Sequence, residues 1–465
     1  MAQQPLLQVD LVARLQRLSR ARQPAQTVRA LRQLLDQHAT RAVAAGVTAL
    51  PDQELANLLV QLPDDLVAQL VADLESSEGA ALLLRLTRMR AADVLDAMAP
   101  DDAADVLAAA DTVTKGTEQA LLQEMQPCAA GDVRRLLAYP PDSAGGIMTT
   151  RVAVVPPGLT AAEALAAVRK LAQQPRTETV YYLYVTDPDQ KLRGVFSLRE
   201  LVLAPPDTPV AAVMRRGFAA VRPNTDQEQA ARLLTEKHLL AVPVVDAGGR
   251  LLGIITADDV ADVLQQEATE DIYRLGGVYE EEDALSPLGH SLRVRVPWLL
   301  LNLLTAFLAA AIVAPFESTI SRVAALAVFM PVIAGHGGNT GTQVATIVVR
   351  SLSVGTMRLG DVWRVVRKEV AFGLVHGLLA GGLAAGYALV LSQNPWLALV
   401  VVVAMVGNVM VAGLVGSLIP LGLRRIGQDP ALASSIWLTT FTDMFGFFAL
   451  LGMGAVLVAK LSTAP

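Results

Sequence analysis

The pattern of apolar positions changes abruptly near residue 290. Beyond it, uninterrupted apolar segments alternate with short polar stretches, and each segment is long enough to cross the roughly 30 Å hydrocarbon core of a bilayer as a helix. We therefore expect an all-α transmembrane domain with five helices over residues 291–465. The segments cover about residues 296–316, 323–349, 370–391, 395–421 and 431–459.

Residues 1–135 follow a different pattern, in which apolar positions recur with the period of short amphipathic helices. Two of these helices begin alike, in "LPDDLVAQLVADL" at 62–74 and "APDDAADVLAAAD" at 99–111. A proline followed by carboxylates is typical of a helix N-terminus, because the acidic groups meet the positive end of the helix dipole. We predict an all-α superhelix of short stacked helices for this N-terminal domain.

Residues 136–262 contain a tandem repeat of strand and helix units. In the first part of each copy, "GIMTTRVAVV" is similar to "AVMRRGFAAV", and the match aligns Met148 with Met214. In the second part, "GVFSLRE" is similar to "GIITADD", and the match aligns Gly194 with Gly253. The repeat predicts two α/β domains of the same fold.

The two halves of the chain differ in charge. Residues 1–290 hold 39 acidic and 27 basic side chains, whereas residues 291–465 hold 5 and 11. If the N-terminus is cytoplasmic, nine Lys and Arg residues flank the predicted spans on the inside and two on the outside, in agreement with the positive-inside rule. The single cysteine, Cys128, fits a reducing cytosol, and no signal-peptide pattern opens the chain. We expect a multi-pass membrane protein with a cytoplasmic N-terminus.

Ionisable side chains are scarce inside the predicted spans, where Asp443 accompanies His336 and His376. A carboxylate at the membrane centre costs about 2.5–3.5 kcal/mol on insertion scales, so it normally faces a cavity or a counter-ion. Thr439 and Ser435 precede Asp443 by four and eight residues and share its helical face. We interpret this face as part of an ion pathway. The alternative is a structural aspartate bonded to a neighbouring helix.

The second predicted span contains the polar stretch "PVIAGHGGNTGTQ" at 331–343. Gly337 and Gly341 form a G-x-x-x-G pattern, which is typical of closely packed membrane helices. Close packing does not explain the hydrogen-bonding side chains of the same stretch, which need protein or water partners in hydrocarbon. We therefore predict that the stretch lines a pore, and we interpret His376 and Asn408 as packing contacts. The side chains in question are Asn339, Thr340, Thr342 and Gln343.

A strongly acidic segment, "TADDVADVLQQEATEDIY" at 256–273, leads from the repeat towards the first span. Six carboxylates fall within 14 residues, and no Lys or Arg lies between Arg250 and Arg274. Unrelieved like charges oppose helix formation by about 0.2–0.5 kcal/mol per pair. A solvated acidic face would explain the segment. Its position nevertheless makes the connecting helix, residues 263–290, the route by which a cytosolic signal would reach the spans.

The repeat resembles a pair of CBS domains, including "GVFS" and "GIIT" followed by acidic residues. The order of helical domain, CBS pair and spans resembles the MgtE family of magnesium channels. "PVIAGHGGNTGTQ" is similar to that family's Pro…Gly-Gly-Asn-x-Gly-x-Gln signature, and "DPALASSIWLTTFTD" to its last-helix signature, although Ile436 stands where the family usually has proline. The resemblance implies no enzyme, but a passive inward Mg²⁺ channel in a prokaryotic inner membrane. It also implies a homodimer within the lipid bilayer and no nucleic-acid partner.

Two sets of Mg²⁺ ligands follow from the resemblance. The pore set comprises Asp443, Asn339, Thr439 and Gly338. The regulatory set, which would close the pore at high cytosolic Mg²⁺, comprises Asp101, Asp102, Glu228, Asp258, Asp259, Asp262, Glu267, Glu270 and Asp271. The chemistry agrees, because Mg²⁺ keeps several waters and takes one or two carboxylates, and a two-fold dimer would supply two copies of the pore aspartate.

A second interpretation is a proton-coupled carrier, or a carrier of Mn²⁺ or Co²⁺, that ATP or another adenine nucleotide regulates at the CBS pair. Glu200 and Asp259 stand where CBS domains often hold a ribose. Carriers usually show repeats among their spans and more than one intramembrane carboxylate, and the sequence shows neither. Oxygen ligands alone do not distinguish Mg²⁺ from Mn²⁺ or Co²⁺.

Overall fold

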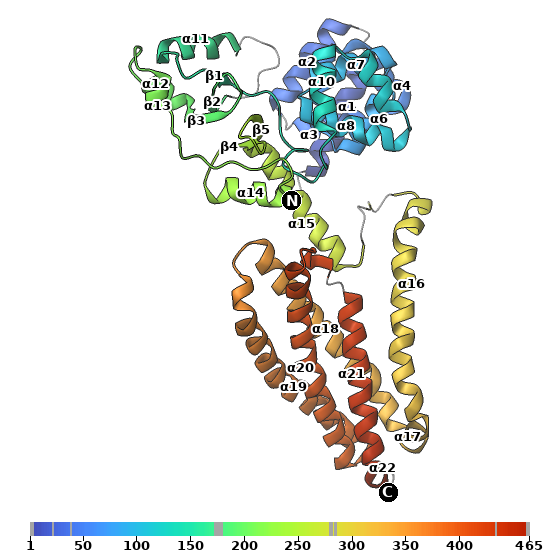
Figure 1. Ribbon diagram of the computed structural model, residues 1–465. Coiled ribbons are helices and arrows are strands. Elements are labelled where there is room, and N and C mark those ends of the chain that lie inside the picture. The colour runs from blue at the N-terminus through green and yellow to red at the C-terminus, as the bar shows by residue number, and fades with distance from the viewer. Residues whose placement is uncertain are drawn as a thin grey trace. The chain divides into compact units, whose positions relative to one another are not determined.

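The computed structural model describes residues 4–20, 23–37, 40–171, 180–278, 282, 286–432 and 435–461. The chain forms two compact units, which we call unit 1 (residues 1–265) and unit 2 (residues 266–465). Figure 1 shows their helices and strands. The division falls inside helix α15 (Ala257–Leu275), so this one helix contributes residues to both units.

Unit 1 begins with short helices that share one core, in which Leu15, Leu58 and Leu107 are fully buried. Helix α5 follows Pro63, helix α8 begins at Pro100, and each has two carboxylates in its first turn. The predicted helix starts and the helical N-terminal domain are therefore confirmed. The helices are α1 (Gln4–Arg20), α2 (Pro24–Gln37), α3 (Thr40–Thr48), α4 (Asp52–Gln61), α5 (Asp64–Ala72), α6 (Ser76–Leu83), α7 (Arg88–Ala97), α8 (Pro100–Val113), α9 (Thr117–Glu124) and α10 (Pro127–Leu136).

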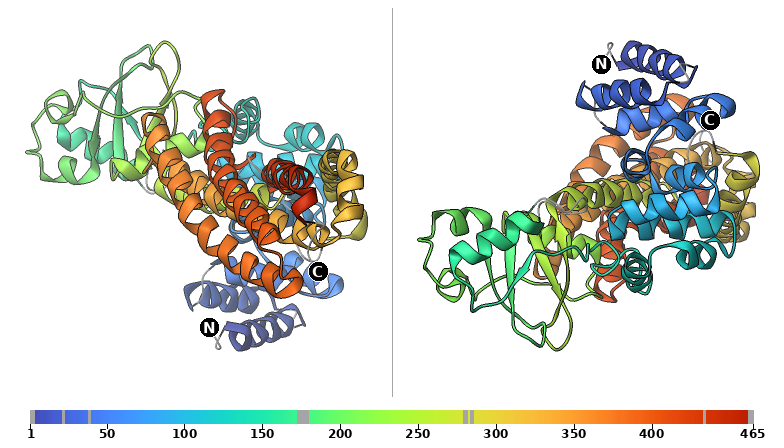
Figure 2. Two further views of the ribbon diagram at one scale, coloured as in Figure 1. Left: turned by 90° about the horizontal axis from the view of Figure 1, so that it is seen from below. Right: turned by 90° about the horizontal axis from the view of Figure 1, so that it is seen from above.

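The tandem repeat supplies the strands of unit 1, and Figure 2 shows them grouped apart from α1–α10 in both views. In the first copy, β1 pairs parallel with β2 and β2 pairs antiparallel with β3; in the second, β4 pairs antiparallel with β5. The elements are β1 (Val154–Val155), α11 (Ala161–Leu171), β2 (Tyr182–Thr186), β3 (Leu192–Ser197), α12 (Leu198–Leu203), α13 (Val210–Val213), α14 (Gln227–Glu236), β4 (Ala241–Val245) and β5 (Leu251–Thr256).

The two copies of the repeat exchange contacts. A Cβ on Gly253 would lie 2.9 Å from the Sδ of Met148, and one on Gly194 would lie 2.7 Å from the Sδ of Met214. Each methionine therefore packs on the glycine of the other copy. The backbone pairs across the two copies in the same way. The residue that follows each methionine forms a β-bridge with the residue that follows the glycine packed against that methionine. The predicted repeat is confirmed, and its two copies form one interlocked body.

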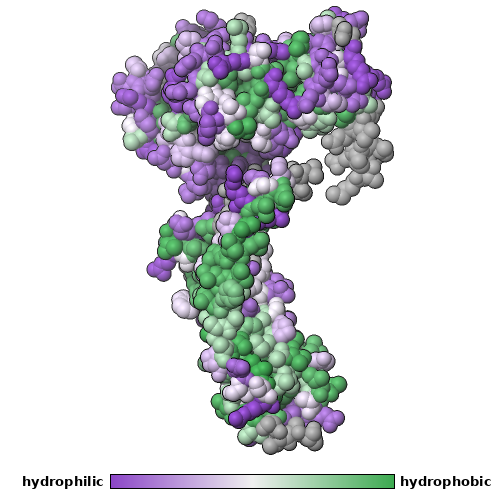
Figure 3. All heavy atoms as spheres, turned by 90° about the vertical axis from the view of Figure 1, so that its right-hand side faces the viewer, coloured by the Kyte–Doolittle hydropathy of each residue, from purple (hydrophilic) through white to green (hydrophobic). Residues whose placement is uncertain are grey.

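Unit 2 is built from long helices. By length and composition, four helical stretches among the described residues can cross a membrane, the first of which runs on through α17. Helix α18 has 29 residues but is not one of these four stretches, because the polar stretch 331–343 lowers its mean hydropathy. Figure 3 looks onto α16, whose exposed side chains are mostly hydrophobic. The helices are α16 (Leu288–Val313), η1 (Ala314–Phe316), α17 (Glu317–Arg322), α18 (Ala325–Ser353), η2 (Leu359–Asp361), α19 (Val362–Ser392), α20 (Pro395–Arg425), η3 (Pro430–Leu432), α21 (Ser435–Val456) and α22 (Val458–Leu461).

Glycines set the distance between α19 and α20. Gly373, Gly377 and Gly381 recur every four residues on α19, and a Cβ on each would lie 3.0, 2.8 and 3.3 Å from a backbone atom of α20. Such close backbone approach is the usual role of small residues in membrane helices. Helix α18 packs in turn against α20 and α21, so α20 is the centre of the bundle.

We predict that Gly253→Ala destabilises unit 1. The new Cβ would lie 2.5 Å from the carbonyl oxygen of Thr149, a backbone atom that cannot move aside alone. We expect a loss of about 1–3 kcal/mol, the usual range for overpacking, seen as a lower melting temperature of the full-length protein. Gly217→Ala is the matched control, because nothing lies within 4 Å of its added Cβ. Equal melting temperatures for the two variants would contradict the exchanged contacts.

Candidate functional site

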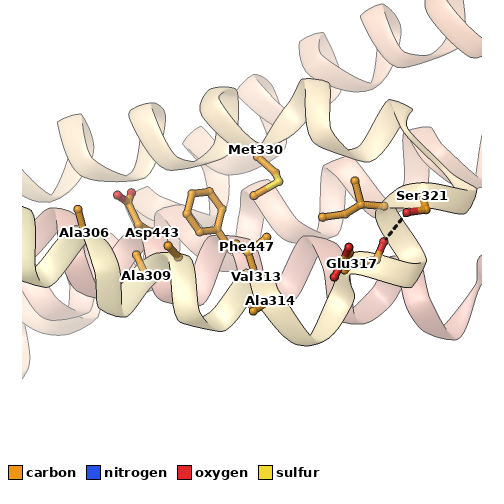
Figure 4. Close-up of a pocket in the computed structure, with 11 residues that line it drawn as sticks. Ala306, Ala309, Val313, Ala314, Glu317, Ser321, Met330, Asp443 and Phe447 are labelled. Atoms are coloured by element: carbon orange, nitrogen blue, oxygen red, sulfur yellow. Dashed lines mark hydrogen bonds between the residues drawn. The ribbon is translucent and has the colours of Figure 1, made fainter.

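Asp443 lies on α21, is half-buried, and lines a pocket of about 670 Å³ within unit 2 (Figure 4). In the figure its carboxylate lies towards one end of the pocket, whereas Glu317 and Ser321 lie at the other end. No described residue forms an ion pair with Asp443. Most of the lining is apolar, and it consists of Ala306, Ala309, Ala310, Val313, Ala314, Glu317, Ile320, Ser321, Met330, Asp443 and Phe447.

Thr439 stands one helical turn before Asp443, against Gly338 of α18. A Cβ on Gly338 would lie 3.0 Å from the Cγ2 of Thr439, so glycine permits this close approach. The Thr439 hydroxyl donates to the carbonyl oxygen of Ile436 at 3.1 Å, and its oxygen keeps lone pairs that can bind a cation or water. The side chain of Ser435, predicted on the same face, lies outside the described residues.

Asn339 belongs to an exposed polar stripe of α18. Asn339, Gln343, Thr346 and Arg350 are all exposed, and their spacing places them along one side of the helix. Gly337 and Gly341 are buried. Amides uncovered in hydrocarbon are costly, so the stripe requires water or another protein surface.

Two further polar contacts hold α18 in the bundle. The Nδ2 of Asn408 donates to the carbonyl oxygen of Ile333 at 2.8 Å, in a space that Gly337 leaves open. The Nε2 atoms of His336 and His376 lie 2.9 Å apart, and their rings are stacked. These contacts agree with the packing roles predicted for Asn408 and His376.

The last turns of α15 are bonded to other parts of unit 2. Asp271 accepts a hydrogen bond from the Oγ of Ser353 at 3.0 Å. Arg274 forms ion pairs with Glu270 and with Asp429, which lies just before η3. The prediction of an unrelieved acidic run was therefore wrong at this end, because the arginine four residues later neutralises Glu270.

Carboxylates also meet in unit 1, where the start of α15 lies near α8. The carboxylate of Asp101, a residue only 8% exposed, repels that of Asp259. Asp259 in turn repels Asp105. Loss of hydration, followed by repulsion from Asp101, raises the pKa of Asp259 to about 7. Loss of hydration and the charge of Asp259 raise the pKa of Asp105 to about 6, although part of Asp105 is exposed.

A second acidic pair joins Asp262 of α15 to Asp73, which follows α5. Loss of hydration and then repulsion from Asp262 raise the pKa of Asp73, and Arg41 partly opposes this shift. Asp73 and Asp105 are not among the residues predicted from the sequence. Asp105 stands four residues after Asp101, a helical spacing that could have identified it. Nothing in the sequence points to Asp73.

The remaining predicted regulatory residues are not gathered into one cage. Among the described residues, no group of three or more His, Cys, Asp or Glu side chains could hold a metal ion. Glu228 forms an ion pair with Arg232 at 2.7 Å, Asp258 is exposed, and Asp102 and Glu267 are half-buried. The acidic groups of unit 1 therefore meet as repelling pairs rather than as a finished metal site.

Glu200 and Asp259, the candidate nucleotide contacts, occupy equivalent helix N-termini. Ser197 and Glu200 form a capping box, and Glu200 also accepts from the Nη2 of Arg215 at 2.6 Å. Asp259 accepts hydrogen bonds from the backbone N–H of Thr256, at 3.3 Å, and from its hydroxyl. Capping explains both acidic residues, and a nucleotide role stays a prediction.

Comparisons with known protein families match all three parts of the chain. A family described as "Divalent cation transporter" matches residues 330–453, the "MgtE intracellular N domain" matches residues 38–142, and CBS domains match residues 144–207 and 210–266. The magnesium transporter MgtE of Thermus thermophilus is 41% identical over 342 residues, which are 73% of this chain and 75% of that protein.

Two solved structures are similar to the N-terminal part. The soluble part of a magnesium transporter is 29% identical with a TM-score of 0.51, and the match covers 56% of this chain and 99% of that structure. The cytosolic domain of the Mg²⁺ channel MgtE, solved in complex with ATP, is 36% identical with a TM-score of 0.42 and covers 50% of this chain and 98% of that structure.

We predict that Asp259→Asn flattens the pH dependence of stability of unit 1. A carboxyl group whose pKa is raised by folding holds its proton more tightly in the folded chain. Its contribution to folding is therefore full below its usual pKa of 3.8 and is lost as the pH rises towards about 7. Without divalent ions, the parent should lose on the order of 1–3 kcal/mol between about pH 4 and pH 8, and the variant less. Denaturant unfolding measures this difference, with the exposed Asp93→Asn as control. An unchanged pH slope in Asp259→Asn would contradict the repelling pairs.

Proposed function

The chain belongs to the MgtE family of magnesium transporters, and from this premise we propose that it is a Mg²⁺-selective channel with passive inward flux, closed by cytosolic Mg²⁺. Its apolar helices and its relatives indicate a membrane protein, and the relatives are transporters rather than enzymes. The proposed setting is a prokaryotic inner membrane, with unit 1 in the cytosol and α18 as the fifth span.

The observation that carries the pore proposal is the exposed polar stripe of α18, a helix that packs against the α21 that bears Asp443. A second copy of the chain, related by a two-fold axis, would cover the stripe and enclose water beside it. It would also bring a second Asp443 to the pathway. Two carboxylates with neutral oxygens from Asn339, Thr439 and the backbone at Gly338 suit an ion that keeps most of its hydration shell.

The repelling carboxylates of unit 1 support the gating proposal. A divalent ion bound near Asp101, Asp105 and Asp259 would replace repulsion by attraction and stabilise the closed arrangement of unit 1. Each bound ion would contribute RT ln(1 + [L]/Kd), so several sites of millimolar affinity would give a steep response.

Helix α15 would transmit the change. Asp259 lies in its first turn, whereas Asp271 and Arg274 near its end are bonded to Ser353 and Asp429 in unit 2. A shift at the start of this helix would therefore act on residues bonded to the end of α18 and to the segment between α20 and η3. The remaining predicted ligands, Asp102, Glu228, Asp258, Asp262, Glu267 and Glu270, would add to the acidic surface on which cytosolic Mg²⁺ acts.

The competing function is a proton-coupled carrier, or a carrier of Mn²⁺ or Co²⁺, that ATP regulates at the CBS pair. Ion flux into liposomes that contain the purified protein separates these functions. A Mg²⁺ gradient alone drives flux through a channel, whereas a proton-coupled carrier also responds to a pH gradient. Parallel measurements with Mn²⁺, Co²⁺ and Ca²⁺ test the selectivity.

We predict that Asp443→Ala lowers Mg²⁺ flux by about tenfold or more while the dimer stays assembled. A tenfold loss corresponds to about 1.4 kcal/mol of lost attraction, which is modest for a charge in a partly dehydrated site. The control is Asp361→Ala, which removes a carboxylate of unit 2 that is ion-paired with Arg364 and does not line the pocket. Parent-like conduction by Asp443→Ala would show that the pore is elsewhere.

We predict that the double variant Asp105→Asn/Asp259→Asn no longer responds to cytosolic Mg²⁺. The amides bind Mg²⁺ weakly, and they also remove the repulsion that Mg²⁺ would relieve. Limited proteolysis between about residues 260 and 290 should be slowed by millimolar Mg²⁺ in the parent and in the control Asp93→Asn, but scarcely in the double variant. If Mg²⁺ protects all three proteins equally, or none of them, the sensor is not at this surface.

A further inference from the structure

Five carboxylates lie beyond residue 290, and they fall into two groups. Asp361, Glu369 and Asp429 each form an ion pair. Within the described part of the chain, Glu317 and Asp443 form none, and neither side chain accepts a hydrogen bond. Both nevertheless line the same pocket (Figure 4). The two uncompensated carboxylates of the membrane half therefore share one cavity, although 126 residues separate them.

We propose that Glu317 is an outer cation-binding residue and that the pocket is a vestibule between it and Asp443. This inference rests on the proposed channel function and adds a site to it. Glu317 follows η1 at the end of the first apolar segment, which the cytoplasmic N-terminus places on the outer side. Asp443 is eight residues into α21 and lies near the middle of the predicted last span. The pocket thus extends from the outer surface towards mid-membrane.

The volume of the pocket suits a hydrated ion. Six waters at about 30 Å³ each occupy about 180 Å³, whereas the pocket measures about 670 Å³. The volume therefore leaves room for Mg²⁺ with its inner hydration shell, which matters because the ion sheds water reluctantly. Ala306, Ala309 and Ala310 form one wall, and their methyl groups occupy little of the pocket and do not compete with water for the ion.

The two carboxylates would act differently because their surroundings differ. Glu317 is exposed, so water strongly screens its attraction for a cation. Such a group concentrates cations at the mouth of an apolar cleft and leaves them free to move on. Asp443 is half-buried and less screened. Glu317 should therefore set the external Mg²⁺ concentration at which flux saturates, and Asp443 should set the maximal flux.

The first test is Mg²⁺ flux into liposomes with the full-length protein. Glu317→Gln should raise the external Mg²⁺ concentration for half-maximal flux about three- to tenfold, and the maximal flux should stay within about twofold of the parent. Glu317→Asp should restore most of the loss, and the difference between Gln and Glu should shrink at high ionic strength. Asp361→Asn is the carboxylate control. An unchanged saturation curve for Glu317→Gln, or a loss confined to maximal flux, would overturn the proposal.

A second test does not depend on flux. Ala306→Cys in a Cys128→Ser background places one thiol in the pocket, and Ala311→Cys places one on the same helix outside the pocket. A positively charged thiol reagent added from outside should label Cys at position 306, external Mg²⁺ should slow that labelling, and Glu317→Gln should weaken the protection at least about threefold. Labelling at position 311 should be insensitive to Mg²⁺.

The outcomes separate the vestibule from the channel. If Asp443→Ala conducts like the parent but Mg²⁺ still protects position 306 through Glu317, the pocket binds cations and the channel assignment fails. If Asp443→Ala stops flux but position 306 is inaccessible or unprotected, the channel stands and the vestibule is wrong. Protection by a hydrophobic amine but not by Mg²⁺ would identify an organic-cation pocket and would also overturn the proposal.

Discussion

A carboxylate withdrawn from bulk water requires a cation, a proton or retained water, and this requirement governs both units of the molecule. In unit 1, Asp259 and Asp105 lie near another acid and hold protons to a higher pH than usual. In unit 2, Arg274 neutralises Glu270, whereas Asp443 lies in a pocket without an ion-pair partner among the described residues. A divalent cation would compensate the negative charge both at the acidic pairs of unit 1 and at Asp443. The same ion could then be the transported substrate and the regulator.

The glycines of α18 determine which of its faces packs closely and which face keeps exposed polar side chains. Gly338 lets α18 approach Thr439, and Gly337 makes room for the side chain of Asn408. With these small residues turned into the bundle, the amides of Asn339 and Gln343 remain exposed. Close packing and pore lining looked like competing interpretations of residues 331–343. Because a helix presents different faces to different neighbours, the stretch serves close packing on one face and leaves polar groups for a second function on another.

The sequence was sufficient where periodicity or length decides the structure, as for the helical segments, the proline-and-acid helix starts and the tandem repeat. It did not predict that Met148 packs on Gly253. Internal alignment shows which positions are equivalent, but equivalence alone does not distinguish contacts within a copy from contacts between copies. Glu317 was also missed, because a charge just past an apolar segment resembles an ordinary flanking residue. Its pocket exists only because α21 lies beside α16, α17 and Met330 of α18, which come far earlier in the sequence.

The proposed sensor in unit 1 has more carboxylates than the proposed ion pathway in unit 2, and this difference follows from their tasks. A sensor must remain occupied at millimolar cation, which favours several acidic groups on one surface, as the pairs formed by Asp101, Asp105 and Asp259 would provide in the proposed sensor. A conduction pathway must release each ion quickly, so its sites must attract without retaining. In the proposed pathway, one half-buried carboxylate per chain at mid-span is approached through an apolar pocket with one exposed carboxylate at its mouth. Such an arrangement would attract a divalent ion weakly and leave its hydration shell largely intact. If the acidic grouping of unit 1 were placed in the pocket, it would bind the ion more tightly and slow its passage.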